Sequence, residues 1–154
     1  MQLSDILKPE GVRLIHQTTS KKRLFHELGD MAFACYGFDG ELATEALQAR
    51  EALGPTGVGH GVAIPHARMA AVKGVCGMFV RLEKPLDFDA VDRQPVDLLF
   101  TLFAPEGAGV DHLKALALVS RTMRERDVRA KLRANDDPAA LHAILTEGMT
   151  SEAA

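Results

Sequence analysis

Apolar side chains recur at two different spacings along the chain, and these spacings separate predicted helices from predicted strands. Between residues 24 and 35 an apolar residue returns every third or fourth position, which is typical of a helix with one buried face. The residues at that spacing are Leu24, Phe25, Leu28, Met31, Ala32 and Cys35. Thr18, Thr19 and Ser20 are all suited to the N-cap of this helix, and Gly37 to its end. A second helix is predicted from Asp39 to about Leu53.

Short runs rich in apolar residues predict the strands. The expected strands are residues 12–15, 62–64, 75–82 and 96–103. The run at residues 98–103 has Thr101 as its only polar residue, which indicates a strand buried on both faces. Residues 3–7 predict a short helical turn that stops before Pro9.

Helices return in the last third of the chain. The expected helices are residues 112–123, residues 127–133 and a last one beginning at Asp136 or Asp137. Asp111 is suited to cap the first of them, and Pro138 falls in the first turn of the last. This mixture of strands and helices predicts an α/β fold, with a central β-sheet flanked by helices on both faces. The 154 residues fit a single domain, placed at residues 1–149, with a tail at residues 150–154.

Composition and charge argue against several classes of protein. The net charge of -3 gives no basic face for nucleic acid. No stretch approaches the roughly 18 apolar residues of a membrane helix, and the N-terminus lacks the pattern of a signal peptide. Cys35 and Cys76 have no metal or redox spacing and are expected to be free thiols in the cytoplasm. The basic stretch at residues 121–133 is either a solvated helix face or a docking surface for an acidic partner.

The candidate chemistry gathers around a glycine-rich segment at residues 54–61. Glycine lets backbone N–H groups come close to an anion. His66 follows this segment, and Pro65 restricts the backbone just before it, so the imidazole is held in one direction. A neutral imidazole nitrogen is a competent nucleophile near neutral pH. By the residues alone, His66 is either an active-site nucleophile or a structural histidine at a strand end.

Other residues could assist chemistry on a phosphate group. Arg50 offers a guanidinium that suits phosphate, and Thr56 offers a hydroxyl. His112 lies at a predicted helix N-terminus, where it could bind an anion or cap the helix, but the sequence alone does not bring it near His66. His60 adds a second imidazole within the glycine-rich segment. The histidine spacing matches no zinc pattern and the glycines match no nucleotide-binding loop, so we expect neither a metal nor a cofactor.

One long segment resembles a known family. It covers residues 50–66 and reads Arg-Glu-Ala-Leu-Gly-Pro-Thr-Gly-Val-Gly-His-Gly-Val-Ala-Ile-Pro-His. It is similar to the signature of the enzyme IIA proteins of the mannitol/fructose class in the bacterial phosphotransferase system. The resemblance continues at residues 88–100 and at His112, and so covers nearly the whole chain. It implies the mannitol-type IIA fold, a mixed sheet between helices, in which residues 1–149 form one IIA type-2 domain.

The resemblance also implies a mechanism. His66 would accept a phosphoryl group from a phosphohistidine on a small HPr-like protein. His112 would lie close by and hydrogen-bond the phosphoryl group, and Arg50 and Thr56 match positions of the same site. Such transfer needs no metal and no nucleotide. His60 stands where the nitrogen-regulatory branch often has Asn, and could compete as a second site.

Residues 3–7 and 88–100 look most like that nitrogen-regulatory branch. Its members are cytoplasmic proteins whose phosphorylation state regulates partners such as potassium transport or sensor components. The resemblance therefore implies a regulatory phosphocarrier that acts without nucleic acid and without membrane insertion. One alternative is a sugar-specific IIA component, for fructose or mannitol, that passes phosphate to a IIB domain. Another is a binding module that has the fold but takes no phosphate.

Overall fold

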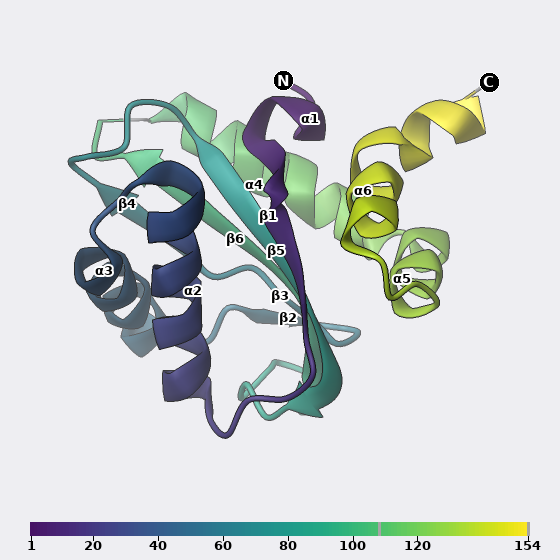
Figure 1. The fold of residues 1–154 in the computed structure, drawn as a ribbon, viewed down its shortest axis with the longest axis horizontal. Helices are drawn as coiled ribbons and strands as arrows, with labels where there is room; N and C mark the ends of the chain where they lie inside the picture. Colours follow the sequence, from purple (N-terminus) through teal and green to yellow (C-terminus); the bar gives the residue numbers. More distant parts are fainter. Residues whose placement is uncertain (108, 154) are drawn as a thin grey trace.

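The computed structural model describes residues 1–107 and 109–153, and within them a six-stranded sheet lies between two layers of helices (Figure 1). The strands are β1 (Leu7–Ile15), β2 (Gly57–Gly59), β3 (Val62–Ala63), β4 (His66–Met69), β5 (Cys76–Leu86) and β6 (Val96–Pro105). The helices are α1 (Leu3–Ile6), α2 (Lys21–Tyr36), α3 (Gly40–Leu53), α4 (Val110–Arg124), α5 (Arg126–Arg133) and α6 (Pro138–Ala153). In the described part of the chain, no helix combines the length and the hydropathy that a membrane-spanning helix requires.

The sheet is mixed. Its strand order is β1-β5-β6-β3-β2, and β4 also pairs with β6. The pairs β1–β5, β3–β6 and β4–β6 are parallel, whereas β5–β6 and β2–β3 are antiparallel. The expected α/β architecture, a mixed sheet with helices on both faces, is therefore confirmed.

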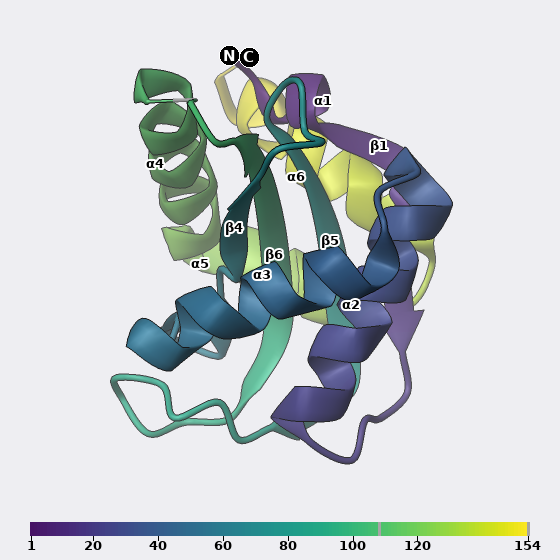
Figure 2. The same ribbon diagram turned by 90° about the vertical axis from the view of Figure 1, so that its left-hand side faces the viewer.

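Side chains of the two central strands alternate between two hydrophobic cores. Met78 and Leu99 belong to the core that α2 and α3 cover, while Phe79 and Leu98 belong to the core on the opposite face. Helices α1, α4, α5 and α6 contribute to this second core, and Figure 2 shows α4 and α3 on opposite sides of the sheet. Both faces of β6 are buried, as the apolar run at residues 98–103 predicted.

Several helix ends follow directly from the sequence. The Ser20 hydroxyl accepts from the backbone of Arg23, and Gly37 ends α2 in the left-handed conformation with φ 77°. Asp39 caps α3 through the backbone N–H of Leu42. The expected end at Gly37 is confirmed, and the N-cap expected within residues 18–20 is Ser20. Each capping residue supplies a local partner or conformation that the helix end requires.

Other boundaries differ from the prediction. The helix that Asp111 was expected to cap begins at Val110, with Gly109 at the N-cap and no side-chain cap, so Asp111 lies in its first turn. Strand β1 begins at Leu7 rather than residue 12, because Leu7 also pairs with β5 across a register shift. The glycine-rich segment contains strand β2. The predicted tail falls on helical backbone at residues 150–153, and residue 154 lies outside the described residues.

An interruption in the strand beside β6 positions the functional site. β3 pairs with Leu98 and Leu99, and β4 pairs farther along the same strand, starting at Leu102. Between the two pairings the chain passes through Ile64 and Pro65, where the backbone N–H of Leu102 donates to the Pro65 carbonyl at 2.9 Å. Proline has no N–H to give to a ladder, so regular pairing stops there. His66 resumes the strand.

Packing between β2 and the segment before β6 predicts that Gly57→Ala destabilises the protein. A Cβ at Gly57 would lie 2.8 Å from Cβ of Ala90 and 3.0 Å from its Cα, so the two backbones would have to separate. We expect the free energy of unfolding to fall by about 1–3 kcal/mol, as is typical of overpacking. Urea denaturation would measure it. Gly74→Ala is the matched control, because a Cβ at Gly74 meets nothing within 4 Å, and an equal loss in both variants would contradict the prediction.

Candidate functional site

A surface depression of about 450 Å³ is lined by residues of α3, β4 and α4. Figure 2 shows these three elements at one edge of the sheet. The lining residues of the depression are Ala46, Ala49, Arg50, His66, Ala67, Arg68, His112, Leu113 and Leu116. The structure thus brings His112 together with His66 and Arg50, from which it is far removed in the sequence. Thr56, the fourth residue predicted for the site, does not line this depression.

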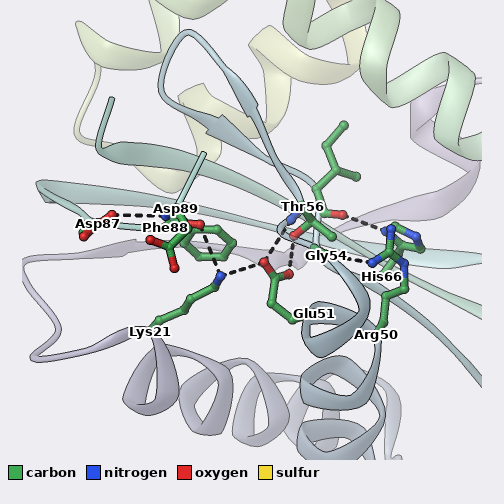
Figure 3. A network of polar contacts seen from close by, with 10 residues as sticks. Lys21, Arg50, Glu51, Gly54, Thr56, His66, Asp87, Phe88 and Asp89 are labelled. Atoms are coloured by element: carbon green, nitrogen blue, oxygen red, sulfur yellow. Dashed lines mark hydrogen bonds and ion pairs between the residues drawn. The ribbon is translucent and has the colours of Figure 1, made fainter. Parts of the chain in front are cut away.

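His66 is held by a backbone contact. Its Nδ1 lies 2.8 Å from the carbonyl oxygen of Ile64, and Figure 3 draws this contact beside Arg50. A carbonyl only accepts hydrogen bonds, so Nδ1 carries the hydrogen. In the neutral ring Nε2 then keeps its lone pair and is the nucleophilic nitrogen.

The surroundings of His66 keep the ring neutral. Burial lowers the pKa of His66 below its usual value, and the positive charge of Arg50 lowers it further. The hydrogen bond to Ile64 and the charge of Glu51 act in the opposite direction. Burial outweighs them because a charged imidazolium loses hydration there. The ring is therefore available as an unprotonated nucleophile at neutral pH.

His112 faces His66 from the first turn of α4. The two ring centroids are 5.6 Å apart, with the ring planes at 69°. His112 is only 4% exposed, and its Nε2 is buried with no hydrogen-bond partner among the residues described. Burial, followed by the charges of His66 and Arg68, lowers the pKa of His112, so this ring is also neutral. A neutral ring with an unused nitrogen can receive or hold a ligand at this position.

Arg50 lies at the end of α3 that borders the depression. Its Nη1 donates to the carbonyl of Gly54 at 3.0 Å, which satisfies a backbone acceptor just beyond the helix. This contact holds the guanidinium beside His66 (Figure 3). Arg50 is therefore placed where it can attract an anion that enters the depression.

Glu51 ties the glycine-rich segment to both α2 and α3, a role that the sequence analysis missed. Its carboxylate accepts from the Thr56 backbone N–H at 2.9 Å and from the Thr56 hydroxyl at 2.5 Å. It also pairs with Lys21 at 2.7 Å, and Lys21 donates to the Phe88 carbonyl at 3.2 Å (Figure 3). The Thr56 hydroxyl is thus engaged with Glu51. The sequence signal was a carboxylate five residues before a threonine at the start of a glycine-rich segment.

His60 lies in a different environment. It is exposed, has φ 57°, and donates its backbone N–H to Asp92 at 2.9 Å. Its carbonyl accepts from Arg133 at 2.7 Å. His60 borders two other depressions and not the one that holds His66. Within the described part of the chain, no three His, Cys, Asp or Glu side chains gather in a group that could hold a metal ion.

Comparison with known proteins places this arrangement in a family. Residues 5–148 match the family described as the phosphoenolpyruvate-dependent sugar phosphotransferase system, EIIA 2. The chain belongs to this family. It is 44% identical to a nitrogen regulatory protein of Bradyrhizobium diazoefficiens over 94% of this chain and 95% of that protein.

Solved structures of other proteins share the fold. The crystal structure of nitrogen regulatory protein IIA-Ntr from Neisseria meningitidis has a TM-score of 0.86 and 39% identity, covering 92% of this chain and 97% of that one. IIA mannitol from Escherichia coli has a TM-score of 0.74 and 18% identity, covering 90% of this chain and 97% of that one. The expected mannitol-type IIA fold and the resemblance to nitrogen-regulatory EIIA proteins are thus confirmed.

Removal of the Glu51 carboxylate is expected to destabilise the protein strongly. In Glu51→Ala the buried Thr56 loses two acceptors and Lys21 loses its ion-pair partner. Breaking a buried pair leaves the other partner uncompensated, so we expect a loss of about 3 kcal/mol in the free energy of unfolding. Urea denaturation would measure it. Glu45→Ala, at an exposed position of the same helix, should change stability by less than about 0.5 kcal/mol, and equal effects would contradict the assignment.

The two lowered histidine pKa values predict a loss of stability on acidification. Below the usual histidine pKa of about 6.5, both histidines bind protons in the unfolded chain. In the folded protein His66 and His112 stay unprotonated to a lower pH, because their pKa values are lowered. The free energy of unfolding should therefore fall as pH decreases from 6.5, until it passes the folded-state pKa values. Urea denaturation between about pH 7 and pH 5 would show it. The decrease should be smaller in the double variant His66→Gln/His112→Gln, and an unchanged slope would contradict the prediction.

Proposed function

We propose that this protein accepts a phosphoryl group on Nε2 of His66 from a phosphohistidine of a small HPr-like protein, and that its phosphorylation state regulates partner proteins. The observation that carries the proposal is the Nδ1 contact of His66 with Ile64, at 2.8 Å, which leaves Nε2 as the free nitrogen. The second support is the buried and unpartnered Nε2 of His112 on the facing ring.

The transfer is an in-line displacement at phosphorus. The Nε2 lone pair of His66 forms the new N–P bond while the N–P bond of the donor breaks, and the donor imidazole leaves with its electron pair. The His66 ring keeps its Nδ1 hydrogen, and the Ile64 carbonyl stabilises the positive charge that develops on the ring. Phosphoryl transfer is promoted mainly by positioning and by donors for the equatorial oxygens. His112 and Arg50 are the side chains assigned to that task.

We assign the protein to regulation because both the relative from Bradyrhizobium and the structure from Neisseria carry nitrogen-regulatory names. We propose the cytoplasm as its location because the family resemblance implies it. Phosphorylation adds roughly two negative charges at the depression. Leu113 lines this depression and is 63% exposed, and Val110, three residues earlier in α4, is 62% exposed. A partner such as a potassium-transport or sensor component could therefore dock on apolar side chains and respond to the added charge beside them.

Phosphorylation by a phosphorylated HPr-like donor tests this function. We expect intact mass measurements to show one added, acid-labile phosphoryl group on the wild-type protein and none on His66→Ala. His60→Ala is the matched control and should be phosphorylated like wild type, because His60 lies outside the depression. Phosphorylation of His66→Ala but not of His60→Ala would mean that His60 is the acceptor, and no phosphorylation with an active donor would favour a binding module.

The same phosphorylated protein distinguishes the sugar-specific alternative. It would be mixed with IIB domains specific for fructose or mannitol, and the mass of each protein would be followed. Retention of the phosphoryl group on this chain supports the regulatory assignment. Rapid transfer to a IIB domain would establish a sugar-specific IIA component instead.

A further inference from the structure

We propose that Arg68 is a positioning residue of this site, which fixes His112 in the tautomer that presents an Nε2–H to the phosphoryl group on His66. The inference rests on the proposed function, since it names how the facing histidine is prepared for that group. The main observation behind the inference is the hydrogen bond from Nε of Arg68 to Nδ1 of His112, at 3.2 Å.

The strand geometry places Arg68 on the correct face. Side chains two residues apart in a strand point to the same side, so Arg68 follows His66 on β4. Ala67 and Met69 alternate with them and are buried in the core beneath α2 and α3. Arg68 therefore projects toward α4, where it meets His112 in the lining of the depression.

The direction of the hydrogen bond determines the tautomer. The arginine Nε always carries a hydrogen, because the guanidinium is not deprotonated in proteins. The acceptor must then be an unprotonated Nδ1, and a neutral His112 ring carries its hydrogen on Nε2. The opposite tautomer would set Nδ1–H against the Arg68 N–H, and would turn the Nε2 lone pair toward an incoming oxygen.

The unpartnered Nε2 of His112 indicates why the contact with Arg68 matters for phosphoryl binding. Its Nε2 is buried and has no partner among the residues described, whereas buried polar groups of proteins are nearly always hydrogen-bonded. The ring centroid of His112 lies 5.6 Å from that of His66. An oxygen of a phosphoryl group on His66 would therefore be the acceptor for the Nε2–H of His112. Arg68 thus acts through His112, and it decides whether that ring donates to the phosphoryl group or repels it.

Nitrogen-15 NMR of histidine-labelled protein, without any donor, tests the tautomer directly. In wild type we expect His112 to show an unprotonated Nδ1 and a protonated Nε2. In Arg68→Met both signals should move toward the averaged values of exchanging tautomers, and Arg68→Lys should restore them in part, because the ammonium can also donate to Nδ1. Arg50→Met removes a guanidinium from the same depression without a contact to His112, and should leave the His112 signals in place.

Phosphorylation rates complete the test. Removing a donor from the site itself costs about 10²–10³ in rate, so Arg68→Met, which acts through His112, should cost about tenfold. In a His112→Gln background, whose amide donor has no tautomer, adding Arg68→Met should cause little further loss.

Three outcomes would overturn the inference: unchanged His112 signals in Arg68→Met, a wild-type His112 that carries its hydrogen on Nδ1, or an equal rate loss in both backgrounds. Failure of wild type to accept phosphate would instead refute the proposed function. The NMR measurement would still decide whether Arg68 sets the tautomer.

Discussion

The burial and pairing of β6 are the constraint on which the rest of the structure depends. This strand is covered on both faces and pairs with β5 on one edge and with β3 and β4 on the other. Its alternate side chains enter the two cores, so each helical layer is positioned against the same strand. The site is built at the edge of this arrangement, where β4 resumes pairing at the position of Leu102. The relative placement of α3 and α4 thus follows from a strand that contributes no side chain to the lining of the depression.

Around this strand, the site is assembled from short contacts made by several elements. The glycine-rich segment is tied to α3 by Glu51, and Lys21 extends the connection to α2 and to the Phe88 carbonyl. Arg50 is held by Gly54, and His112 is held by Arg68. Each functional side chain therefore has a partner that restricts it before any ligand arrives. Such preorganisation is what electrostatic stabilisation of a transferring group requires.

Much of the fold could be predicted from the sequence, because its determinants are local. The apolar period of α2, its Ser20 and Gly37 caps and the apolar run of β6 are all visible without tertiary information. Strand β4 was missed because its four residues are identified by pairing with β6 rather than by a pattern of their own. The Asp111 cap was wrong because Val110 already belongs to the helix.

The candidate site was predictable only in part. His66 and Arg50 stand within one continuous segment that resembles the family signature, whereas the placement of His112 beside His66 is a product of tertiary structure. Thr56 was expected to contact the phosphate, but its hydroxyl donates to Glu51 instead. The sequence alone does not show which of these two acceptors the hydroxyl takes. Arg68 was missed because its partner is 44 residues away.

The contact of His66 with Ile64 has a genetic consequence. The regiochemistry of attack by this imidazole is set by a main-chain oxygen, which every amino acid at residue 64 would supply. No side-chain substitution there can delete it, so the choice between the two ring nitrogens is protected from point mutation at the residue that makes it. Only a change in the path of the backbone, at the interruption between β3 and β4, could reverse that choice.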